Sequence, residues 1–111
     1  MTTVCTPVIQ ISRGFRGACD SRRLLFQAEN VDVDVRLSPT GDIWTIIGQV
    51  LSGDGRLLPP IVVQLLSDGA SIRKAKTNYI GEFTFAEIEP STFVLEVDLP
   101  DGRMLCGLEV G

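Results

Sequence analysis

The stretch VDVDVRLS, residues 31–38, places an apolar residue at every second position. Successive side chains of a β-strand point to opposite faces, so this period of two predicts a strand with one buried face and one wet face. The turn sequence PTGD at residues 39–42 ends that strand, and the largely apolar run at residues 43–51 predicts the next one. This region therefore indicates a β-sheet.

Short apolar segments separated by Gly, Pro and Asp turns continue on both sides of this region. No segment predicts a helix longer than two turns. Many short strands at such spacing are typical of a sandwich, with a barrel as the less favoured alternative. We therefore expect an all-β fold, a single β-sandwich of seven to nine short strands. The further strands are expected at residues 23–28, 61–66, 72–77, 82–85, 92–98 and 104–110, and the core is expected to include Val33, Val35, Trp44, Val63, Leu65, Phe83, Phe85 and Leu95.

Composition limits the chemistry that this chain can perform. Its 111 residues correspond to one domain, large enough to bury a core without a metal or disulfides. The chain has no His, which excludes Ser-His and Cys-His catalytic pairs and histidine zinc sites. Cys5, Cys19 and Cys106 lack CxxC spacing, so we interpret them as ordinary thiols of a reducing compartment. The sequence thus predicts no enzyme, no catalytic residue, no cofactor and no metal.

Charge is divided unevenly along the chain. Residues 1–23 carry four Arg and one Asp for a net charge of +3, whereas residues 24–111 carry a net charge of −7. An acidic body repels nucleic acid, so we expect no nucleic-acid partner. The first residues are also rich in Thr, Ser and Gly. These differences separate an N-terminal arm at residues 1–21 from a sandwich domain at residues 22–111.

The arm offers a docking element. The segment Val8–Ile11 has β-propensity and could add to a sheet edge, either in its own chain or in a neighbour. Arginines on both sides of Phe15 could contact an acidic partner, although a solvated arm without a binding role is the alternative. The sequence therefore predicts a protein-interaction or assembly module whose partner is another protein or another copy of itself. The predicted partner-binding residues are Val8, Ile9, Ile11, Arg13, Phe15, Arg16, Arg22 and Arg23.

About residues 46–98 resemble a known family. The segments IGQV at 47–50, GDGR at 53–56 and PIVVQL at 60–65 resemble the opening half of carboxypeptidase regulatory-like domains. The closing half of that family is resembled by a second set of segments, TN at 77–78, GEFTF at 81–85, Ile88, Pro90 and FVL at 93–95. Where the family has Gly and Tyr after the proline, this chain has Ser91, Thr92 and Phe93.

The resemblance concerns the fold and carries no catalytic motif. It implies a prealbumin-like (transthyretin-like) sandwich related to the B repeats of collagen adhesins. The transthyretin-related hydroxyisourate hydrolases need histidines, which this chain lacks, so that activity is not expected.

Two features leave a second function class open. Asp32 and Asp34 share the polar face of one strand and could hold Ca²⁺, although calcium loops bring more oxygens at closer spacing and a solvated face is the simpler interpretation. Trp44 could stack on a sugar if it is exposed, or fill the core, which we favour because sugar platforms need several aromatic residues. The alternative function is therefore a carbohydrate- or calcium-binding module.

The sequence also bears on location. The first residues lack the apolar run of a secretory signal, and no apolar segment is long enough to span a membrane. We expect a cytoplasmic protein, with a secreted mature form as the alternative.

Overall fold

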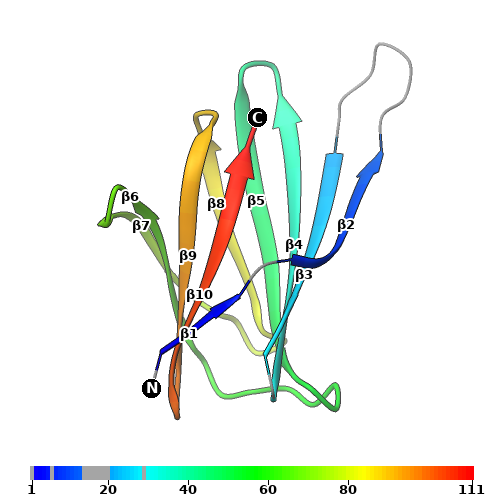
Figure 1. The fold of residues 1–111 in the computed structure, drawn as a ribbon, viewed down its shortest axis with the longest axis vertical. Helices are drawn as coiled ribbons and strands as arrows, with labels where there is room; N and C mark the ends of the chain where they lie inside the picture. The colour runs from blue at the N-terminus through cyan, green and yellow to red at the C-terminus, as the bar shows by residue number, and fades with distance from the viewer. Residues whose placement is uncertain (1, 6, 14–20, 29) are drawn as a thin grey trace.

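The computed structural model describes residues 2–5, 7–13, 21–28 and 30–111, and the side chains of residues 2–4, 21–28 and 30–111. These residues form strands, turns and loops with no helix among them, and the strands are arranged as two five-stranded sheets that face each other (Figure 1). The all-β sandwich expected from the periodicity is therefore confirmed.

Each sheet combines strands from distant parts of the chain. The first sheet has the order β1-β10-β9-β6-β7, and the second has the order β2-β3-β4-β5-β8. Neighbouring strands are antiparallel, except that β1 and β10 run parallel. The strands are β1 Thr2–Cys5, β2 Pro7–Arg13, β3 Ser21–Gln27, β4 Val31–Thr40, β5 Ile43–Ser52, β6 Val62–Ser67, β7 Ala70–Lys76, β8 Glu82–Ile88, β9 Ser91–Leu99 and β10 Gly102–Val110.

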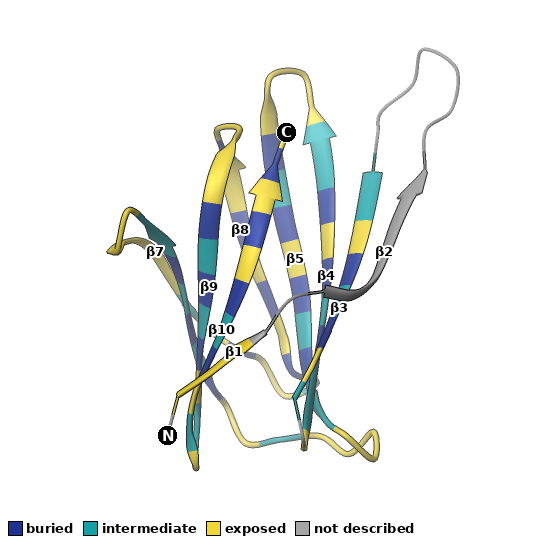
Figure 2. Cartoon of the chain, viewed as in Figure 1, coloured by how far each residue is buried: buried dark blue, intermediate teal, exposed yellow. Residues whose placement is uncertain are grey.

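The core lies between the sheets and follows the alternation of the sequence. In β4 the side chains of Val33, Val35 and Leu37 have no exposed surface, while Asp32, Asp34 and Arg36 between them keep contact with solvent. Figure 2 shows the same bands of buried and exposed residues along β5, β9 and β10. All eight residues expected in the core are buried, and Phe83 packs its ring on Phe85 with 5.6 Å between centroids.

Eight strands span residues 21–110, one at each place where the sequence predicts a strand. The structure extends β8 to Ile88, three residues beyond the expected end. Glu87 adopts a left-handed φ of 57°, and the β5–β8 register shifts by one residue between Trp44 and Ile46. This bulge lets Ile88 enter the core after Phe85, although the two are three residues apart.

The segment TNYIGEF, residues 77–83, forms the turn from β7 to β8, and its Asn and Gly have structural roles there. The Asn78 side-chain oxygen accepts hydrogen bonds from the backbone N–H groups of Ile80 (3.1 Å) and Glu82 (2.9 Å). Gly81 has φ +82°, and a Cβ atom there would lie 2.4 Å from the carbonyl oxygen of Val50. Only glycine fits this combination of backbone conformation and close approach.

Candidate docking surface at the sheet edges

Four strands form the outer edges of the two described sheets. β1 and β7 bound the first sheet, and β2 and β8 bound the second. Between Cys5 and Pro7 the chain passes from the first sheet to the second, so the N-terminal strands lie along one side of the sandwich (Figure 1). On the opposite side β7 and β8 approach each other. An open strand edge presents unpaired N–H and C=O groups, which makes these edges the candidate docking sites.

Residues 2–4 of β1 are held chiefly through their backbone. Thr2, Thr3, Val4 and Cys5 pair in parallel register with residues 103–106 of β10. The side chains of Thr2, Thr3 and Val4 are exposed, and Val4 keeps 76% of its surface accessible. β1 therefore adds little apolar burial of its own in residues 2–4, and apolar burial is what gives most strands their stability.

β2 contains four of the predicted partner-binding residues. It pairs antiparallel with β3, with a register shift between Pro7 and Ile9. Val8, Ile9, Ile11 and Arg13 belong to this strand, and their side chains lie outside the described part of the structure. Phe15 and Arg16 lie wholly outside the described residues. The segment Val8–Ile11 is expected to add to a sheet edge of its own chain or of a neighbour. In the structure it pairs with β3 of its own chain.

Arg22 and Arg23, the other two predicted partner-binding residues, face different environments. The guanidinium of Arg22 lies 5.9 Å from the centroid of the Trp44 ring and donates to the carbonyl oxygen of Glu109 in the opposite sheet. Arg23 instead pairs with Asp34, with its Nε 3.0 Å from Asp34 Oδ1, and this bonding raises the pKa of Arg23. Its side chain remains 54% exposed, so Arg23 can still contact a partner, whereas Arg22 ties the two sheets together.

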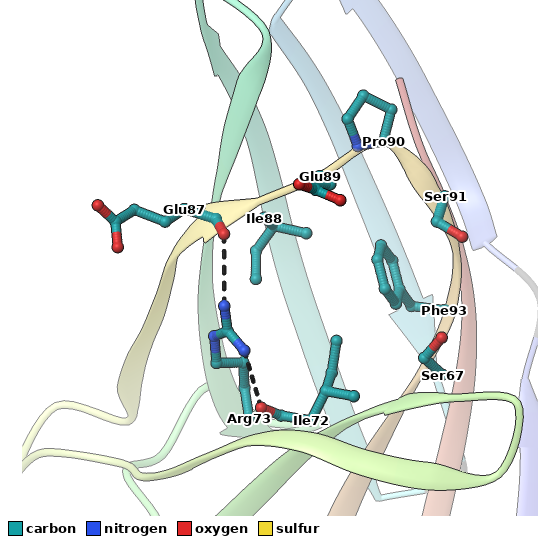
Figure 3. Close-up of a pocket in the computed structure, with 9 residues that line it drawn as sticks. All are labelled: Ser67, Ile72, Arg73, Glu87, Ile88, Glu89, Pro90, Ser91 and Phe93. Atoms are coloured by element: carbon teal, nitrogen blue, oxygen red, sulfur yellow. Dashed lines mark hydrogen bonds between the residues drawn. The ribbon is translucent and has the colours of Figure 1, made fainter.

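The side of the sandwich between β7 and β8 holds a feature that sequence reasoning missed. An open cavity of about 450 Å³ lies there between the two sheets (Figure 3). The β6–β7 register shifts between Leu65 and Leu66, so both strands that border the cavity carry a bulge. The cavity is lined by Ser67, Ile72, Arg73, Glu87, Ile88, Glu89, Pro90, Ser91 and Phe93.

Arg73 links these two edges by hydrogen bonds. It lies opposite the fully buried Leu65 in the register, which places it on the inner face of β7. One guanidinium nitrogen donates to the carbonyl oxygen of Ile72 at 2.9 Å and the other to that of Glu87 at 3.4 Å (Figure 3). Bulges and inward-pointing charges are two devices that keep an edge strand from pairing with another chain. The β7 and β8 edges are therefore guarded, and the N-terminal edges are the better candidates for docking.

A signal for the β8 bulge was present in the sequence. The apolar residues Phe83 and Phe85 keep a period of two, and the next apolar core residue, Ile88, breaks it by one position. A strand that keeps its apolar face on the core across such a break needs one extra residue. The place of Arg73 opposite Leu65 depends on the pairing of β6 with β7 and has no local signal.

Two of the three residues considered for ligand binding, Trp44 and Asp34, are engaged in other contacts. Trp44 is 9% exposed and has Arg22 against its ring, so its face is covered. Asp34 is paired with Arg23. Among residues whose side chains the structure describes, no group of three or more acidic or thiol side chains is arranged to hold a metal ion. Nor does the described chain contain a helix that is both long and apolar enough to cross a membrane.

Comparison of the chain with protein-family models, curated proteins and solved structures finds no match. The fold and the geometry of the edges are therefore the basis for a functional proposal.

Proposed function

We propose that this chain is a non-enzymatic interaction module that assembles with further copies of itself through its N-terminal strands. The observation that carries the proposal is the position of β1 and β2, which are the outermost strands on one side of both sheets. A partner protein with an open sheet edge would be recognised by the same backbone hydrogen bonds. The opposite edges are guarded by Arg73 and two bulges, so docking is assigned to the N-terminal side.

Exchange of β1 between copies is favoured by how it is held. Its release breaks four residue pairs with β10 and exposes little further surface of Thr2, Thr3 and Val4. When the strand then pairs with β10 of another copy, the same backbone pairs form again. The lost contacts are therefore replaced in kind, and the remaining cost is that of bringing two chains together.

Charge supports a second copy as the partner. The first 23 residues carry a net charge of +3 and the rest of the chain carries −7. The N-terminal segment of one copy is thus attracted to the body of another, which speeds their encounter at low ionic strength. Between copies, this attraction acts together with backbone pairing.

We also propose that the sandwich belongs to the carboxypeptidase regulatory-like, prealbumin-like group. The geometry of residues 77–83 supports this, because Asn78 and Gly81 have a structural role at the positions that carry the resemblance. That group membership would imply a binding or structural role and no catalytic site.

Cysteine cross-linking between two populations of the chain tests the assembly proposal. Val4 is the register partner of Leu105 on β10, and neither side chain is in the core. One population carries Val4→Cys and the other Leu105→Cys, both in a background with Cys5→Ser and Cys19→Ser. After concentration together and mild oxidation, we expect a disulfide-linked dimer that contains one chain of each kind.

Two controls separate exchange from failure to react. A single chain with both substitutions should form the link internally at low concentration, which shows that the pair can react. A population with Tyr79→Cys, exposed on the turn before β8, should give no specific dimer with Leu105→Cys. If the double variant links internally and the mixed populations stay monomeric, the assembly proposal is wrong.

A further inference from the structure

The parallel pairing of β1 with β10 brings two cysteines together. In the β1–β10 register Cys5 is the direct partner of Cys106, so residues near opposite ends of the chain meet at one point of the first sheet. Neighbouring strands lie about 4.8 Å apart, within the range of Cα separations that a disulfide spans. We propose that Cys5 and Cys106 form a reversible disulfide that fastens the N-terminal strand to the C-terminal strand.

The burial of Cys106 determines how this bond would form. Its side chain has no exposed surface, and Met104 and Leu108 on the same face of β10 are also buried. A dissolved oxidant therefore reaches Cys106 poorly while the sheets are packed. We assign the attack on the oxidant to Cys5, because β1 is a four-residue edge strand whose release would bring Cys5 to the oxidant, and Cys106 then completes the bond from within the sheet.

A disulfide such as oxidised glutathione can oxidise the two thiols in two steps. The Cys5 thiolate attacks one sulfur of the oxidant, which forms a mixed disulfide and releases one glutathione thiolate. Cys106 then loses its proton and displaces the second glutathione, so that the protein loses two protons and two electrons and the oxidant becomes two thiols. A reducing dithiol reverses both steps.

The bond would close a loop that includes nearly the whole chain. Cross-links that close long loops restrict the unfolded chain most, so the oxidised protein should have a melting temperature higher by about 10 °C or more. The bond would also keep β1 on its own β10. Its effect on assembly rests on the function proposed above: oxidation would hold the monomer and reduction would release the strand for exchange.

The test treats the full chain with oxidised glutathione, blocks remaining thiols under denaturing conditions and maps the peptides by mass spectrometry. We expect a peptide pair that joins Cys5 to Cys106, with one thiol, that of Cys19, remaining. Cys19→Ser should leave the pair unchanged, and Cys5→Ser should keep Cys106 reduced. Circular dichroism confirms that each variant is folded.

Three results would overturn the inference. The first is that the unsubstituted chain keeps all three thiols and is oxidised no faster than the Cys5→Ser variant. The second is a bond that joins Cys5 to Cys19 instead. The third is Cys5 found only as a stable glutathione adduct. The cross-linking test of assembly uses chains that lack Cys5, so the two proposals fail independently. A Cys5–Cys106 bond without any exchange of β1 would leave this inference intact and remove the assembly proposal alone.

Discussion

Replacement of Gly81 by Ala tests whether the turn between β7 and β8 is fixed by a backbone contact. Any L-residue with a side chain pays about 1–2 kcal/mol for the left-handed conformation that Gly81 adopts at φ +82°. At this position the new Cβ would also lie 2.4 Å from the carbonyl oxygen of Val50. Because the obstacle is backbone and not a flexible side chain, the turn itself must move.

That movement has a calculable cost. The turn is joined to β5 by a hydrogen bond from Val50 N–H to the Gly81 carbonyl (2.9 Å) and by one from Gln49 Nε2 to the Ile80 carbonyl (2.9 Å). Each contributes about 1 kcal/mol. Loss of both, added to the conformational cost, gives a destabilisation of about 3–4 kcal/mol for Gly81→Ala.

Gly55 is a matched control in the same chain. It has φ +84°, and a Cβ atom there would meet nothing within 4 Å. Gly55→Ala should therefore cost only the conformational part, about 1–2 kcal/mol. The free energies of unfolding are measured by equilibrium urea denaturation followed by far-UV circular dichroism. Equal losses for the two variants, within about 0.5 kcal/mol, would refute the role of the Val50 contact.

Three other substitutions test separate parts of the structure. Gly48→Ala would place a Cβ 2.1 Å from the Cζ atom of Phe83, and overpacking of this kind should lower the free energy of unfolding in urea by about 1–3 kcal/mol. Phe83→Leu should cost less stability in a chain that already carries Gly48→Ala than it costs alone, and strictly additive losses would argue against the contact. The pKa of Asp54 is lowered by hydrogen bonds from Ser52 Oγ and from the backbone N–H of Arg56, so its stabilising effect is complete above its unfolded pKa of about 4 and disappears as the pH falls through the lower folded value. Asp54→Asn should therefore lower the melting temperature at pH 7, and this deficit should shrink as the pH falls below about 4. A deficit of the same size at pH 7 and at pH 2 would contradict this account. Arg73→Ala removes the donor that bridges the two bulges, and light scattering should detect concentration-dependent association that Lys74→Ala, on the outer face of the same strand, does not produce.

The sequence predicted the fold well because its information is local. Alternation in residues 31–38 identifies a half-buried strand without knowledge of its partners, and the turn residues that separate the other short segments locate the remaining strands up to residue 110. Gly81 could likewise be assigned to a tight turn from its place before Phe83 and Phe85. The structure adds the reason, which is the close approach of Val50.

Features that depend on pairing between distant strands could not be predicted in this way. β1 is only four residues long and has no alternating pattern, and its parallel register with β10 alone brings Cys5 opposite Cys106. Arg73 reaches the inner face only because β7 pairs with β6. Arg22 and Arg23 are adjacent in the sequence, yet strand alternation sends one to Trp44 and the other to Asp34. These two predicted partner-binding arginines therefore lie on opposite faces of β3.

Isotope-filtered NMR on a mixture of two differently labelled copies tests the central claim most directly. One population of the chain carries ¹³C-labelled Val. The other is deuterated, contains no ¹³C and has protonated Leu only, so that contacts between the two kinds of chain are observed separately. If the N-terminal strands exchange, cross-peaks should join Val4 of one copy to Leu105 of the other, and they should grow with concentration. A mixture in which Val4 shows contacts to Leu105 of its own chain alone, at every concentration up to the limit of solubility, would contradict the account.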